Sequence, residues 1–208
     1  MLSPLQDKDG WSRYVEVVWL LTYEGLVMNI LVFVSGSVIL IYVSRASLFK
    51  PRSHGFYRFW AWEVMLLLFL LNRPYWFHDP FSSPQIVGWL VLTLSAVLAL
   101  YGFYLLRHRG QHESGRDDAP MISFEKTANL VTTGIYRYIR HPLYASLLYL
   151  TWGIFCKQVT GLTLLLALTA SVLLYLTVRR EEPENIAYFG QPYLGYMQHS
   201  KRFVPFLF

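Results

Sequence analysis

The chain has 208 residues and a formal net charge of +5; 54% of its residues are hydrophobic, 17% are aromatic and only 15% are charged. This composition excludes a disordered or fibrous protein and is unusual for a soluble domain of this size. Because Tyr and Trp gather beside the apolar runs, as they do at membrane interfaces, we expect an integral membrane protein.

Five apolar segments are candidate membrane spans, since a helix needs about 20 mainly apolar residues to cross about 30 Å of hydrocarbon. In chain order they are Val15–Val43, Phe56–Leu71, Ile86–Leu106, Leu143–Phe155 and Thr160–Val178. The second carries Arg58 and Glu63 and the fourth has only 13 residues, so each must borrow flanking residues or lie in a thinned bilayer. We predict an all-α membrane bundle of about five transmembrane helices, with Glu24 and Glu63 facing its interior.

Lys and Arg residues are distributed unevenly between the loops. With five spans the loops alternate between two sides, and one side holds 14 of these residues, Arg58 included, against 4 on the other. The basic side comprises the loops after the first and third spans, the latter being the long polar segment Arg107–Ala128, and the C-terminal tail. The positive-inside rule places it in the cytosol and the N-terminus outside, most simply in a cytoplasmic (inner) membrane. The positive charge is explained by this topology, so no nucleic-acid partner is expected.

The stretch Leu130–Tyr144, LVTTGIYRYIRHPLY, comes directly before the short fourth span. Proline is favoured at the first position of a helix, so a helix is expected to begin at Pro142, directly after His141. Its unpaired N–H groups and positive end are suited to a carboxylate or a nucleobase acceptor. The alternative is a basic membrane flank, in which Arg137 and Arg140 anchor the helix to lipid headgroups.

The stretch Arg179–Pro205 follows the fifth span and begins with a pair of glutamates. Glu181 and Glu182 point about 100° apart around a helix, so one of them is expected to face a site, and Glu184 is expected to be solvated. A carboxylate near a helix C-terminus is disfavoured by the helix dipole and needs a positively charged partner.

A short second helix is predicted in this stretch, after Gly190 and Pro192 have interrupted the chain. On it Tyr193, Tyr196 and Met197 share one face. By itself such a tail is also compatible with an amphipathic helix lying on the inner leaflet.

The two stretches are expected to meet, because Cys156–Val159 is short enough for a tight turn and makes the last two spans an antiparallel hairpin. Arg140 and His141 would then face the two glutamates, with the short helix as a lid. This predicts a cytosolic pocket with cationic, anionic and aromatic elements, open to the cytosol and to the bilayer.

The ordered combination of LVTTGIYRYIRHPLY, a hairpin, EE, FGxxYxxYM and a closing RFVP resembles the isoprenylcysteine carboxyl methyltransferase family and the related membrane phospholipid methyltransferases, as a bacterial-type member. The resemblance covers Leu130–Pro205. It implies one integral membrane domain over 1–208, with variable spans in 1–129 and an S-adenosylmethionine-binding core in 130–208. The cofactor-site residues that it implies are Leu130, Val131, Gly134, Tyr136, His141, Pro142, Tyr144, Glu181, Glu182 and Tyr193.

The resemblance implies methyl transfer to a lipophilic acceptor that enters from the membrane, an in-line displacement that needs alignment and exclusion of water rather than a metal. As catalytic residues, Glu182 is expected to hold the cofactor's ammonium or ribose hydroxyls, and Arg140 the cofactor's carboxylate or an anionic acceptor. His141 or a glutamate is expected to take a proton from an amine acceptor. An isoprenylcysteine-like carboxylate, a phospholipid amine and a small thiol all stay open as acceptors. So do two other functions, an NADPH-dependent membrane reductase and a non-enzymatic membrane subunit or transporter.

Two further expectations concern single positions. This chain has Pro183 at a position where relatives commonly continue an acidic helix, and the proline is expected to end the fifth helix early. One cysteine and scattered histidines predict no metal site, although His108 and His112 share an i, i+4 spacing.

Overall fold

The computed structural model describes residues 8–51, 53–110 and 128–205, and the side chains within these ranges from residue 23 onward. The contacts divide the chain into two compact units, Met1–Val38 and Ile39–Phe208, and each is considered by itself. The helices are α1 (Lys8–Leu48), α2 (His54–Asn72), α3 (Ser83–Arg109), α4 (Pro142–Phe155), α5 (Gly161–Phe189) and α6 (Gln191–His199), with short 3-10 helices η1 (Arg73–Tyr75) and η3 (Gly134–Arg137). His112 and most of the Arg107–Ala128 loop lie outside the described residues.

The prediction of an all-α membrane bundle is confirmed, and each of the five predicted spans is a helix. Three are long and apolar enough to cross a membrane, namely the part of α1 from Tyr23 to Leu48, α3 and α5. The other two, α2 with 19 residues and α4 with 14, are shorter. Glu63 is buried within the second unit, as expected. Glu24 belongs to the first unit, so its expected place in the interior of the bundle stays a prediction.

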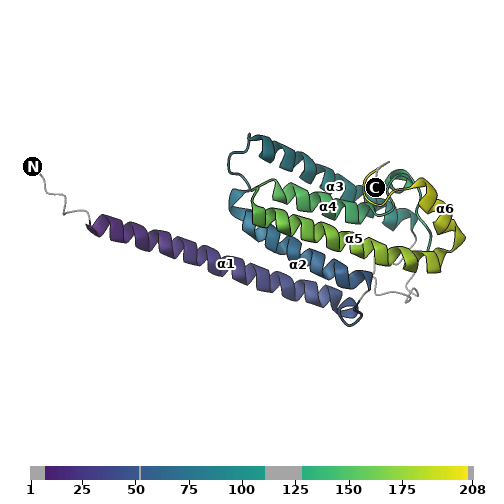
Figure 1. The fold of residues 1–208 in the computed structure, drawn as a ribbon, viewed down its shortest axis with the longest axis horizontal. Helices are drawn as coiled ribbons and strands as arrows, with labels where there is room; N and C mark the ends of the chain where they lie inside the picture. Colours follow the sequence, from purple (N-terminus) through teal and green to yellow (C-terminus); the bar gives the residue numbers. More distant parts are fainter. Residues whose placement is uncertain (1–7, 52, 111–127, 206–208) are drawn as a thin grey trace, which may run out of the picture. The chain divides into compact units, whose positions relative to one another are not determined.

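In the second unit, helices α2 to α5 lie side by side (Figure 1). α3 packs along α4, α2 packs along α5, and α4 also contacts both α5 and α2. A core cluster that includes Ala61, Leu98, Ala145 and Leu174 joins these four helices. A helix of 14 residues is only about 21 Å long, and its central position explains how α4 is accommodated, since helices rather than lipid surround it.

The helix boundaries differ from the prediction at Pro183, which was expected to end the fifth helix. α5 instead continues through Pro183 to Phe189. Proline removes one helical hydrogen bond, but the Pro183 side chain is exposed. Its neighbours Glu182 and Glu184 bind other elements, Glu182 through an ion pair with Arg140 and Glu184 through a hydrogen bond with His54. These ties stabilise the last turns of the helix.

The connection between α4 and α5 is the tight turn that the sequence predicts, and it contains a buried lysine. Lys157 Nζ donates to Gln85 Oε1 at 3.1 Å and lies 3.7 Å from the centroid of the Trp89 ring. A second ring, that of Trp76, is 5.6 Å away. The turn is thereby joined to the start of α3.

We expect Lys157→Met to lower the free energy of unfolding by about 1–2 kcal/mol, because a cation–π contact and a hydrogen bond to a buried amide are lost. For a chain of this size that corresponds to about 2–8 °C in the thermal unfolding midpoint in detergent. Lys157→Arg keeps the charge and should lose less. An unchanged midpoint in Lys157→Met would show that these contacts do not stabilise the turn.

Candidate active site

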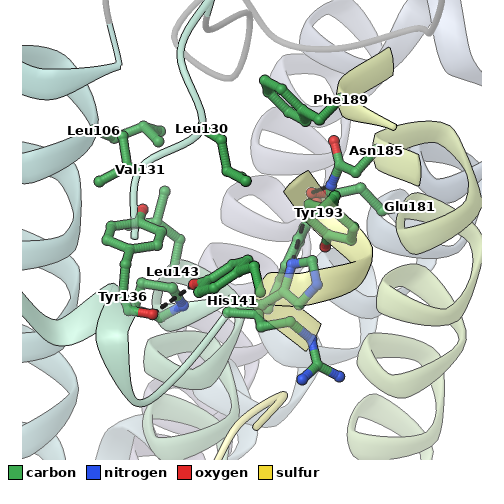
Figure 2. Close-up of a pocket in the computed structure, with 14 residues that line it drawn as sticks. Leu106, Leu130, Val131, Tyr136, His141, Leu143, Glu181, Asn185, Phe189 and Tyr193 are labelled. Atoms are coloured by element: carbon green, nitrogen blue, oxygen red, sulfur yellow. Dashed lines mark hydrogen bonds and ion pairs between the residues drawn. The ribbon is translucent and has the colours of Figure 1, made fainter. Parts of the chain in front are cut away.

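A pocket lies where α3 ends, α4 begins and α5 passes into α6, with a volume of about 670 Å³ when its open mouth is included. Figure 2 shows an apolar wall with Leu106, Leu130 and Val131, opposite a wall with Glu181, Asn185, Phe189 and Tyr193. Nine predicted site residues line it, namely Leu130, Val131, Tyr136, Arg140, His141, Pro142, Tyr144, Glu181 and Tyr193. The segments that the sequence analysis placed together therefore do meet.

The start of α4 is built as predicted, with His141 as the residue before the helix and Pro142 in its first turn. The tail pairs with the chain just before it, since Arg140 N donates to Lys201 O at 2.7 Å and Lys201 N donates to Tyr138 O at 2.9 Å. This forms an isolated parallel bridge between Ile139 and Lys201. The C-terminal residues thereby fix the segment that presents His141.

Gly134 does not line the pocket, and its place is structural. It has a φ of +63°, and a Cβ at this position would lie 2.6 Å from Leu105 Cδ1 on α3. Only glycine fits such a backbone at such a distance. The 3-10 helix that Gly134 begins carries Tyr136, whose carbonyl accepts a 2.5 Å hydrogen bond from the Tyr196 hydroxyl of α6.

Of the two neighbouring glutamates, Glu181 lines the pocket and Glu182 does not, as their separation around the helix predicts. Glu182 is buried and pairs with Arg140 at 2.8 Å and with Arg202 at 2.7 Å. Arg140 also donates to the carbonyl oxygens of Ser200 and Met197. The guanidinium group of Arg140 is thus directed largely at the protein itself and joins α5 to the tail.

Glu181 and His141 form the polar centre of the pocket, with His141 Nδ1 3.6 Å from Glu181 Oε1. Asn185 Nδ2 donates to the same oxygen at 3.4 Å. The His141 side chain is only 4% exposed, and its Nε2 makes no hydrogen bond among the described residues but lies 3.9 Å from Glu182 Oε1, whereas Glu181 Oε2 is buried without a hydrogen-bond partner among them. A buried polar atom in that situation is a candidate contact for a ligand.

Burial lowers the pKa of the His141 imidazole below its ordinary value of 6.5, although Glu181 and Glu182 act in the opposite direction. Arg140 and Arg202 add to the lowering. The imidazole is therefore neutral near pH 7 and able to accept a proton.

The lowered pKa predicts how stability depends on pH. Below pH 6.5 the unfolded chain protonates His141 before the folded protein does, so stability is lost as the pH falls from about 6.5 toward the folded pKa. We expect the thermal midpoint of the wild type to fall over this window and that of His141→Gln to fall less. Parallel curves for the two proteins would contradict a buried, neutral His141.

One expectation about this region was wrong, that Glu184 is solvated. Its Oε2 lies 2.6 Å from Nδ1 of His54, a fully buried residue at the start of α2. This hydrogen bond joins α5 to α2, two helices whose pairing the sequence pattern does not reveal. Arg58, counted above with a loop, is likewise buried within α2.

Five lining residues were missed, namely Leu106, Leu143, Asn185, Phe189 and Tyr196. A signal for two of them was present, because Asn185 and Phe189 follow Glu181 at +4 and +8 and so share its face of a helix. That signal depends on a helix running beyond Pro183, which was not expected. Leu106 comes from α3, outside the two recognised stretches.

Comparison with known proteins decides the family. The model for phospholipid methyltransferases matches residues 84–191, more than half of the chain. The chain belongs to the phospholipid methyltransferase family. The matched residues run from α3 to the start of α6 and include His141 and Glu181.

The chain is also similar to curated methyltransferases. It is 26% identical to methanethiol S-methyltransferase 1 of Bradyrhizobium diazoefficiens over 167 residues, 75% of this chain and 55% of that protein. It is 29% identical to protein-S-isoprenylcysteine O-methyltransferase of Homo sapiens, and equally to that of Mus musculus, over 126 residues, 58% of this chain and 43% of those proteins. The chain thus spans about half the length of the curated relatives it matches. No solved structure is significantly similar to it.

These findings confirm the resemblance drawn from the C-terminal motifs. Together with three apolar helices long enough to cross a membrane, membership of this family makes the chain an integral membrane protein.

Proposed function

We propose that the protein is a membrane methyltransferase that uses S-adenosylmethionine and methylates a hydrophobic or lipid-like acceptor. The observation that carries the proposal is the pocket, in which Glu181 and His141 lie opposite an apolar wall within the family-matched residues (Figure 2). Polar groups converging in a largely apolar cavity are typical of small-molecule sites.

The residues present fit the cofactor. Its ammonium and ribose hydroxyls require acceptors, and Glu181 Oε2 is a buried atom without a hydrogen-bond partner among the described residues, beside the His141 ring in the pocket lining. Its adenine requires an aromatic or apolar surface, and the stacked rings of Phe189 and Tyr193, with centroids 6.3 Å apart, lie on the same wall. We assign the binding of the cofactor to these four residues, with Leu130, Val131, Tyr136, Pro142 and Tyr144 completing the pocket.

When bound, S-adenosylmethionine supplies a methyl group attached to a positively charged sulfur. The nucleophile of the acceptor attacks the methyl carbon in line with the carbon–sulfur bond and displaces the sulfur. The chain contributes alignment of the two reactants and exclusion of water. The neutral His141 is suited to take a proton from a thiol or amine acceptor, whereas a carboxylate acceptor needs no base. Arg140 and Glu182, which bind each other, act in this proposal by holding His141 and the tail in position.

The acceptor is proposed to enter along the apolar wall of Leu106, Leu130 and Val131. The named relatives methylate a small thiol and an isoprenylcysteine, and a phospholipid amine is the third chemical class to test. Incubating the purified protein with labelled S-adenosylmethionine and one acceptor of each class identifies which oxygen, nitrogen or sulfur receives the label.

Binding of S-adenosylhomocysteine tests the proposal independently of the acceptor. We expect calorimetric titration of the detergent-purified protein to show binding of S-adenosylhomocysteine and none of NADPH. Selective binding of NADPH would overturn the proposal in favour of a reductase. Binding of neither would favour a non-enzymatic membrane subunit.

We further propose that the pocket end of the bundle faces the cytosol in a cytoplasmic (inner) membrane. The basic loops lie on this side, and the excess remains large when Arg58, which is buried in α2, is left out of the count. A protease-sensitive tag after Phe208 should be cleaved only from the cytosolic side of oriented vesicles. Cleavage only from outside would invert the topology.

A further inference from the structure

A buried arginine lies behind the pocket, on a helix outside the family-matched residues. Arg58 belongs to α2 and is 1% exposed, whereas the match begins at residue 84. A charged side chain within an apolar helix bundle is costly unless other groups compensate it, and in membrane proteins it commonly has a functional role.

The contacts of Arg58 lead into the pocket. Its NH1 group donates to the Tyr144 hydroxyl at 3.4 Å, and its guanidinium carbon lies 5.1 Å from the centroid of a Trp62 ring. Tyr144 and Glu181 both line the pocket, and the Tyr144 hydroxyl helps to stabilise the charged form of the Glu181 carboxylate. A tyrosine hydroxyl has one proton, so when it accepts from Arg58 its proton is available for the Glu181 carboxylate.

Three groups act on Glu181 through their positive charge, His141 and His54 most strongly and Arg58 more weakly. Of these three groups, arginine is the one that stays positively charged at every physiological pH. His141 is neutral near pH 7 because it is buried. The permanent positive charge behind Glu181 therefore comes from α2 and reaches it through Tyr144.

We propose that Arg58 is a positioning residue of the cofactor site, which orients the Tyr144 hydroxyl and thereby holds the Glu181 carboxylate toward the pocket. The inference rests on the proposed function, because the ligand that Glu181 meets is the cationic ammonium of the methyl donor or a hydroxyl of its ribose. It assigns to a helix outside the matched residues a direct part in cofactor affinity.

A double-mutant cycle tests the proposal, with calorimetric titration of S-adenosylhomocysteine into the full-length protein in detergent. Arg58→Met and Tyr144→Phe should each weaken binding by about tenfold or more. The affinity of the double variant should be within about threefold of that of the weaker-binding single variant, because both substitutions break the same chain of contacts from Arg58 through Tyr144 to Glu181. Arg58→Lys, which keeps the charge, should recover part of the affinity.

Lys157→Met is the matched control, since it also removes a buried cation, at the opposite end of the bundle, and should leave affinity unchanged. If Arg58→Met does not fold, Arg58→Lys takes its place in the cycle. Wild-type affinity in both single variants, or additive losses in the double variant, would overturn the role of Arg58. Absence of binding in the wild type would instead overturn the proposed function, so the two failures are distinguishable.

Discussion

Glu182→Gln is expected to be strongly destabilising, lowering the free energy of unfolding by about 3 kcal/mol. Breaking a buried ion pair commonly costs about 3–5 kcal/mol because the remaining charge is left uncompensated, and Arg140 would be left in that state. The lower end of the range applies because the second partner, Arg202, is 28% exposed and can be hydrated. The thermal midpoint in detergent should fall by about 6–12 °C.

Arg202→Met serves as the comparison for this prediction, since it leaves the Arg140–Glu182 pair intact. Its midpoint should fall by less than that of Glu182→Gln. Equal midpoints in the wild type and Glu182→Gln would show that Glu182 does not join α5 to the tail.

His141→Ala and Glu181→Gln are expected to weaken the binding of S-adenosylhomocysteine by about ten- to a hundredfold, the effect of losing a charge-assisted or buried hydrogen bond to a ligand. Both side chains line the pocket, and neither takes part in the Arg140–Glu182–Arg202 cluster through a short ion pair. Their effect on affinity should therefore exceed their effect on stability. Titration calorimetry measures the first and the thermal midpoint the second.

Arg137→Gln is the control for this pair, because Arg137 is exposed on η3 and does not line the pocket. If the basic stretch before α4 only anchors the chain to lipid headgroups, none of the three substitutions changes affinity. Glu184→Gln is unsuitable as a control, since its carboxylate pairs with His54 and its loss would disturb the contact between α5 and α2.

Much of the fold follows from local sequence. Hydropathy identifies the five long helices α1 to α5, Pro142 marks the start of α4, and the short turn after Phe155 dictates the hairpin. Gly190 and Pro192 likewise mark the change from α5 to α6. These features depend on the properties of a few neighbouring residues, so they can be predicted without a structure.

The ion pairs and the back of the pocket do not follow from local sequence. Arg140 was expected to face the glutamates and pairs with Glu182. Glu182 was, however, expected to meet the cofactor, and its second partner, Arg202, is brought to it only by the folded tail. The same holds for His54 and Arg58, which α2 presents to α5 and α4. Hydropathy indicates that a charged residue within an apolar segment is costly to bury, but it does not indicate which residue pairs with it.

The most direct test of the pocket as the active site is an experimental structure of the protein with S-adenosylhomocysteine. The ligand should lie in the pocket, with its amino acid or ribose groups against Glu181 and His141 and its adenine near Phe189 and Tyr193. A ligand bound elsewhere on the chain, with this pocket unchanged, would contradict the assignment of the pocket as the active site.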